Sequence, residues 1–263
     1  MNFEFKNNYT VDDLISIMKI LRSPNGCPWD KEQTHTSIRQ NFIEETYEVI
    51  EAIDNNDKDL LKEELGDVLL QVVFHSQMEE ETGSFNIDDV ADGICKKLIV
   101  RHPHVFSTEK ADTTEKVLEN WDIIKMKTKS QKTQAEAMES VSKSLPALMR
   151  STKVQQKASK VGFDWDNIDG AFDKVEEELK EVKEAYKLQN KELCADELGD
   201  LLFSVVNVSR FLQVDAEKSL YQACEKFTKR FACVELLANK RNINIKNASV
   251  EELDNLWNEA KQI

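Results

Sequence analysis

Apolar residues recur at three- and four-residue spacing along most of the chain, which is the pattern of helices that bury one face. The first such run follows Thr10 and carries Val11, Leu14, Ile15 and Met18. Further runs predict helices over about 36–54, 58–81, 86–101, 114–127, 145–158, 169–188, 190–212, 216–240 and 249–261. No segment alternates with a period of two residues, so we expect an all-α fold with essentially no sheet.

The chain contains the same helical pattern twice. When residues 44–76 are aligned with 177–209 at an offset of 133, 16 of the 33 positions are identical, whereas average composition would give roughly two. The match extends upstream, where GCPWD (26–30) aligns with GFDWD (162–166). A repeat of this kind indicates a duplicated helical module.

A polar stretch separates the two copies. The sequence KTKSQKTQAEAMESVSKS (127–144) has almost no large apolar residues, and we interpret it as an interdomain linker. We therefore expect an N-terminal module over 1–126 and a C-terminal module over 145–263.

Five acidic residues recur at the same positions in both copies. They are Glu44, Glu45, Glu48, Glu64 and Asp67 in the first copy, and Glu177, Glu178, Glu181, Glu197 and Asp200 in the second. Acids three residues apart lie on one face of a helix, and a turn of about five residues makes the two helices an antiparallel hairpin. The carboxylates of each copy are therefore expected to converge across the hairpin.

Converging carboxylates repel each other unless a cation lies among them. Oxygen ligands without histidine or cysteine favour Mg²⁺ or Mn²⁺. A di-iron site would need Glu-x-x-His on two helices, and the fourth position here is Glu or Asp, so we do not expect iron.

The simpler alternative is that these acids form an ordinary solvated helix face. Two observations count against it: the acids recur while nearby surface positions differ, and Asp67 and Asp200 lie inside apolar runs. Gly66 and Gly199 precede these aspartates at a cost of about 1 kcal/mol each relative to alanine. The missing side chain would let a helix or a ligand approach the backbone, and simple close helix packing is the alternative explanation.

Composition limits the partners and the setting. There are 35 Lys and Arg against 49 Asp and Glu, giving a net charge of −14 that repels nucleic acid and anionic membranes, so we expect neither as a partner. We see no signal peptide and no apolar run of the roughly 20 residues that a membrane helix needs. The five cysteines form no CxxC pair, which favours a reducing cytoplasm.

The doubled EExxE and ExxD motifs, with GCPWDKEQTH followed by FIEETYEVIEAI, closely resemble the MazG family of nucleoside triphosphate pyrophosphohydrolases. The resemblance covers nearly the whole chain. It implies an all-α fold whose helical bundles are completed by homodimerisation. It also implies Mg²⁺-dependent hydrolysis of nucleoside triphosphates to the monophosphate and pyrophosphate.

The resemblance also implies roles for individual residues. Metal ligands would be Glu45, Glu48, Glu64 and Asp67 in the first copy, and Glu178, Glu181, Glu197 and Asp200 in the second. Substrate contacts would be Lys174, Lys226, Arg230 and Trp257, with Lys97, Arg101 and Trp121 as their counterparts in the first copy. The first copy departs from the pattern because Asn41 stands where Lys174 would be.

Two functions remain open from the sequence. In the first, water attacks the triphosphate and Glu44 or Glu177, if not committed to metal, accepts its proton. In the second, the chain is a helical regulatory or dimerisation module that binds nucleotide without hydrolysing it. The sequence does not identify the preferred base and sugar, or whether both copies are active.

Overall fold

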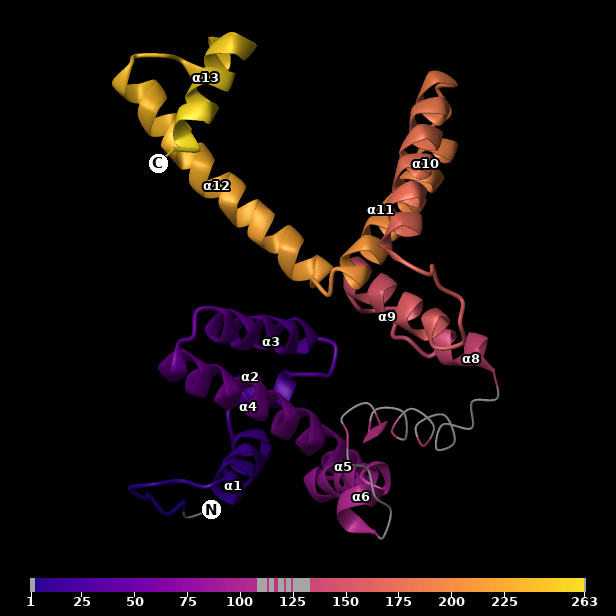
Figure 1. Cartoon of the computed structure of the whole chain (residues 1–263). Coiled ribbons are helices and arrows are strands. Elements are labelled where there is room, and N and C mark those ends of the chain that lie inside the picture. The colour runs from indigo at the N-terminus through magenta and orange to yellow at the C-terminus, as the bar shows by residue number, and fades with distance from the viewer. Residues whose placement is uncertain are drawn as a thin grey trace. The chain divides into compact units, whose positions relative to one another are not determined.

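The computed structural model describes residues 3–107, 113, 116–117, 121, 124 and 133–262. All regular secondary structure in these residues is helical and none of it is strand, which confirms the expected all-α class (Figure 1). The helices are α1 (Val11–Arg22), α2 (Pro28–Glu32), α3 (Arg39–Asp54), α4 (Lys58–Thr82), α5 (Ile87–Arg101), α6 (Pro103–Phe106), α8 (Gln134–Glu139), α9 (Ala147–Ser159), α10 (Ile168–Lys187), α11 (Lys191–Phe211), α12 (Ala216–Lys240) and α13 (Val250–Ala260). None of these described helices has the length and apolar character needed to cross a membrane.

The chain divides into two compact units, Met1–Lys125 and Met126–Ile263. In the first unit α1 begins with a capping box, in which Thr10 and Asp13 satisfy each other's backbone N–H groups. Ion pairs join α1 to α4: Arg22 contacts Glu81 at 2.8 Å, and Lys19 contacts Glu80 at 2.7 Å. The core beneath these pairs consists of Met18, Ile38, Val73, Phe74 and Met78.

The second unit is built around the paired helices α10 and α11, with α9 packed against α11 (Figure 1). The side-chain amide of Gln155 on α9 donates to the carbonyl of Phe203 on α11 at 2.7 Å. Further along the chain, α12 and α13 pack on each other through Val234, Ala238, Leu256 and Ala260. Small alanines at these contacts allow the two helices to approach closely.

The structure contains short helices in two stretches to which the sequence pattern assigned none. The stretch 22–30, to which no helix was assigned, contains the start of α2, because Pro28 supplies the fixed φ that suits a first helical position. Residues 133–144, part of the expected linker, include α8, which packs on α9. Most of the helix expected over 114–127, and linker residues 127–132, lie outside the described part of the chain.

The two mid-helix glycines are not explained by packing within the chain. A Cβ placed on Gly66 or on Gly199 would meet nothing within 4 Å among the described residues. Both glycines are exposed on the hairpin surface. Close approach of another helix of the same described unit is therefore not their cause.

This open space gives a prediction for Gly199→Ala. Alanine has the higher helix propensity and would meet no neighbour, so we expect stability to rise by about 0.5–1 kcal/mol. Thermal melting of the metal-free protein, followed by circular dichroism at low concentration, measures the change. A lower melting temperature would contradict the prediction and would mean that the added methyl group meets a second molecule.

Candidate active site

Each unit contains a helical hairpin closed by the same three-residue turn. In the first, Asn56 takes the left-handed conformation with φ of 54°, and Asp57 then caps α4 by accepting from two backbone N–H groups. In the second, Gln189 has φ of 53° and Asn190 caps α11 in the same way. The turns reverse the chain so that α3 runs antiparallel to α4, and α10 to α11.

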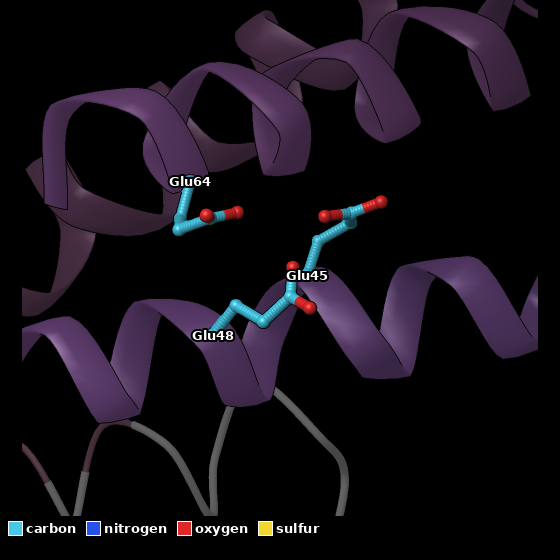
Figure 2. Close-up of side chains that lie close together, drawn as sticks. All are labelled: Glu45, Glu48 and Glu64. Atoms are coloured by element: carbon cyan, nitrogen blue, oxygen red, sulfur yellow. The ribbon is translucent and has the colours of Figure 1, made fainter. Parts of the chain in front are cut away.

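The first hairpin brings three of the expected acids together. Glu45 and Glu48 extend from α3 and Glu64 extends from α4 into the space between the two helices (Figure 2). One carboxylate oxygen from each of the three lies within 4.8 Å of the others. Asp67 follows one turn after Glu64 and is not part of this closest group.

The close packing of these acids changes their pKa values. Burial raises the pKa of Glu45 above its ordinary value, and the negative charges of Asp67, Glu48 and Glu64 raise it further. Burial likewise raises the pKa of Glu64, and contacts with Glu48 add to the effect. The first hairpin therefore concentrates negative charge that only a bound proton or cation can relieve.

The second hairpin forms a corresponding group from Glu178, Glu197 and Asp200, again with one oxygen from each within 4.8 Å. Glu178 is the most enclosed of these residues, with 4% of its surface exposed. Its Oε1 atom is 2.6 Å from the ammonium of Lys174, while its buried Oε2 atom has no hydrogen-bond partner.

Glu181 lies on α10 one turn after Glu178, outside the closest group. Burial raises its pKa, and the negative charges of Glu178 and Glu197 raise it further. Glu181 therefore interacts electrostatically with the acid group although it lies outside it.

The two acids considered as proton acceptors lie on the exposed side of each hairpin. Glu44 accepts a hydrogen bond from the side-chain amide of Gln40 at 3.2 Å. Glu177 accepts one from Lys174 at 2.8 Å. Neither belongs to the closest acid group of its hairpin, although each directly precedes a member of that group in the sequence.

Three of the four expected substrate contacts of the second copy lie on α12 and α13, and the fourth, Lys174, lies on α10. The three behave as a group apart from the acids. Lys226 and Arg230 are four residues apart on α12, and Trp257 of α13 packs on Phe227 with ring centroids 5.0 Å apart. Among the described residues, no hydrogen bond or ion pair joins this group to the acids of α10 and α11. In the first copy, the Arg101 guanidinium lies 5.7 Å from the centroid of the Trp121 ring, and Lys97 is exposed one turn earlier on α5.

A histidine cluster in the first unit was missed by the sequence analysis. The Nδ1 atoms of His35 and His75 are 2.7 Å apart, and His35 Nε2 is 2.8 Å from a carboxylate oxygen of Glu79. The spacing of His75 and Glu79, four residues apart on α4, was the available signal, but His35 comes from a distant loop. The aligned positions of the second copy are Val208 and Leu212, so this cluster belongs to the first unit alone.

Comparison with known proteins adds independent information. The family model for the MazG nucleotide pyrophosphohydrolase domain matches residues 33–106 and again 171–234. The nucleoside triphosphate pyrophosphohydrolase/pyrophosphatase MazG of Thermotoga maritima is 47% identical over 250 residues, covering 95% of each chain. The nucleoside triphosphate pyrophosphohydrolase of Escherichia coli K12 is 44% identical over 257 residues, covering 96% of this chain and 97% of its own.

The histidine cluster generates a prediction for pH. Burial, and then the charge of His35, lower the pKa of His75, so the folded state favours the neutral imidazole more than the unfolded chain does. The resulting stability is present above the pKa of the unfolded chain, about 6.5, and is lost as the pH falls below it. We expect His75→Val, which places the second copy's residue here, to remove this contribution.

The measurement is the change in melting temperature between pH 7.5 and 5.5, compared between wild type and variant. The carboxylates whose pKa values are raised in the folded state stabilise it as the pH falls, which is opposite to the effect of His75. They are present in both the wild type and His75→Val, so their contribution cancels when the two are compared. Wild type should lose more stability on acidification than the variant. Equal changes in the two proteins would rule out this role for His75.

Proposed function

The chain belongs to the MazG nucleotide pyrophosphohydrolase family, and from this premise we propose that it hydrolyses nucleoside triphosphates to nucleoside monophosphate and pyrophosphate. The observation that carries the proposal is the pair of acid groups, each with three carboxylate oxygens within 4.8 Å across a helical hairpin. Such groups can hold the cation that a triphosphate requires. The activity serves to remove unwanted nucleotides from the cellular pool.

The acid groups suit Mg²⁺, with Mn²⁺ as a substitute. All donors are carboxylate oxygens, which hard divalent cations prefer. The buried Oε2 of Glu178 has no hydrogen-bond partner, and a bound cation could supply the missing interaction. The proposed ligands are Glu45, Glu48, Glu64 and Asp67 in the first unit, and Glu178, Glu181, Glu197 and Asp200 in the second. When bound, the metal neutralises phosphate oxygens and lowers the pKa of coordinated water.

The protein's own residues would carry the proton and hold the substrate. Glu177, or Glu44 in the first unit, is a carboxylate beside the acid group and can accept a proton from the attacking water. Attack on the α-phosphorus breaks the bond to the bridging oxygen, and pyrophosphate leaves with that oxygen.

Positive and aromatic side chains would bind the remainder of the nucleotide. Lys226 and Arg230, four residues apart on α12, can hold adjacent phosphates, and Lys174 can join them. Trp257, already packed on Phe227, offers a ring face on which a base can stack. In the first unit Lys97, Arg101 and Trp121 would take these roles, with Asn41 in place of Lys174.

A second copy of the chain is the proposed partner. Large apolar side chains are exposed along both hairpins and along α12, including Ile50 at 42%, Leu202 at 51% and Phe227 at 58%. Contiguous exposed apolar surface on a folded chain marks an association surface. Homodimerisation would cover these faces, complete each pair of helices as a bundle, and allow the α12 residues of one copy to reach the acids of the other.

The cytoplasm is the proposed setting. The five cysteines are all free thiols, as expected where a reducing environment is maintained. Nucleoside triphosphates are also abundant there.

Substitution of the acids tests the activity. In a Glu45→Ala background, which removes a proposed ligand of the first unit, Glu178→Ala and Asp200→Ala should each lower Mg²⁺-dependent pyrophosphate release at least about 100-fold, because both remove charge from the proposed metal site of the second unit. Glu184→Ala, an acid change on α10 outside the acid group, is the matched control and should retain activity.

Pyrophosphate is measured from a panel of nucleoside triphosphates with and without Mg²⁺, alongside Glu45→Ala. Full activity in both second-unit variants would exclude that unit as the active centre. Nucleotide-induced thermal stabilisation of the wild type without any pyrophosphate release would favour the non-catalytic binding module.

The oligomeric state tests the partner. Light scattering during gel filtration should give about twice the 30.3 kDa mass of one chain. Ile50→Glu and Leu202→Glu each place a charge in an apolar face and should shift the protein toward the monomer. A monomeric wild type at micromolar concentration would contradict the proposed dimer.

A further inference from the structure

Lys174 occupies a position inside the second acid group that has no counterpart in the first. It precedes Glu177 by three residues and Glu178 by four on α10, so its ammonium reaches both carboxylates, at 2.8 Å and 2.6 Å. These contacts raise its pKa above the ordinary lysine value, so the side chain is charged at neutral pH. The ammonium already supplies a positive charge at the place proposed for a metal.

The first acid group lacks this internal cation. Asn41 stands at the position aligned with Lys174. Among the described residues, no lysine or arginine forms an ion pair with Glu45, Glu48 or Glu64. The two units therefore balance the same set of acids in different ways.

Building on the proposed function, we propose that Lys174 competes with the divalent metal for Glu178, so that the second site binds metal more weakly than the first until a nucleotide is present. The competition is for one carboxylate, because Lys174 holds Oε1 while Oε2 lies buried and unpartnered. One oxygen of this carboxylate lies within 4.8 Å of oxygens of Glu197 and Asp200. A cation entering there places a second positive charge within a few ångströms of the ammonium. Either the two cations repel each other or Lys174 must leave.

A nucleotide removes the conflict. Its phosphate oxygens offer the displaced ammonium new negative partners, so Lys174 can move from Glu177 and Glu178 to the triphosphate. Metal and nucleotide should therefore strengthen each other's binding at the second site, and by linkage the effect is reciprocal. At the first site Asn41 neither competes with metal nor transfers to phosphate, so metal binding there should depend less on nucleotide.

Exchange of the two aligned residues tests the competition directly. Mn²⁺ binding to the full chain is measured by electron paramagnetic resonance of the free ion, without nucleotide or turnover. To observe each site alone, Lys174→Asn is made in a Glu45→Gln/Glu64→Gln background, and Asn41→Lys in a Glu178→Gln/Glu197→Gln background. Lys180→Asn, an exposed lysine on the same helix, controls for the loss of one charge.

We expect Lys174→Asn to tighten Mn²⁺ binding at the second site about tenfold, Asn41→Lys to weaken the first site about tenfold, and Lys180→Asn to change binding less than about twofold. Unchanged or weaker Mn²⁺ binding in Lys174→Asn would overturn the proposal, as would equal shifts in Lys174→Asn and its Lys180→Asn control. Asn41→Lys provides a second test if Lys174→Asn folds poorly, as judged by circular dichroism.

The nucleotide arm uses α,β-methylene-ATP, whose α–β link cannot be hydrolysed. The analogue should tighten Mn²⁺ binding at the second site about tenfold in the protein with Lys174, and clearly less in Lys174→Asn. Equal tightening in both proteins would refute the transfer of Lys174 to phosphate. These readouts do not involve catalysis, so a protein that shows the shifts but releases no pyrophosphate would refute the proposed activity alone.

Discussion

The repulsion among carboxylates confined between two antiparallel helices is the constraint on which the rest of the structure depends. An isolated pair of exposed acids has little energetic consequence, because water screens it. Here the acids face one another across a hairpin, and burial comes first among the causes that raise the pKa values of Glu45, Glu64 and Glu181. A fold that holds such a group is stabilised by a proton or cation bound among the acids, and this links the helix packing to the proposed binding of metal and phosphate.

Much of this arrangement could be predicted from the sequence because local rules determine it. Capping residues mark where α1, α4 and α11 begin, and the three-residue spacing of the acids places them on one helix face. The prediction of the all-α class, and of MazG family membership from the doubled acid motifs, is confirmed. The assignment of individual acids as metal ligands stays a prediction, although three of the four in each copy come together.

What could not be predicted depends on contacts between distant segments or on side-chain choice. His35 meets His75 and Glu79 across 40 and 44 residues, and no local pattern connects them. Lys174 was expected among the substrate contacts, whereas in the structure its ammonium pairs with Glu177 and Glu178. Helical spacing allows both arrangements, and the choice depends on what else is present in the site. The glycines beside Asp67 and Asp200 are likewise not explained by packing, because no described atom lies within 4 Å of a Cβ placed on either one.

These observations together assign different tasks to two copies that share one scaffold. The acids are retained in both, so the requirement for a central positive charge is the same. The source of that charge differs, because the second copy carries Lys174 and the first carries Asn41. A lysine tethered four residues from its carboxylate is always at high local concentration, so an incoming cation has to displace it. Under the proposed competition, this difference beside the retained acids would make two similar acid groups respond differently to the same metal.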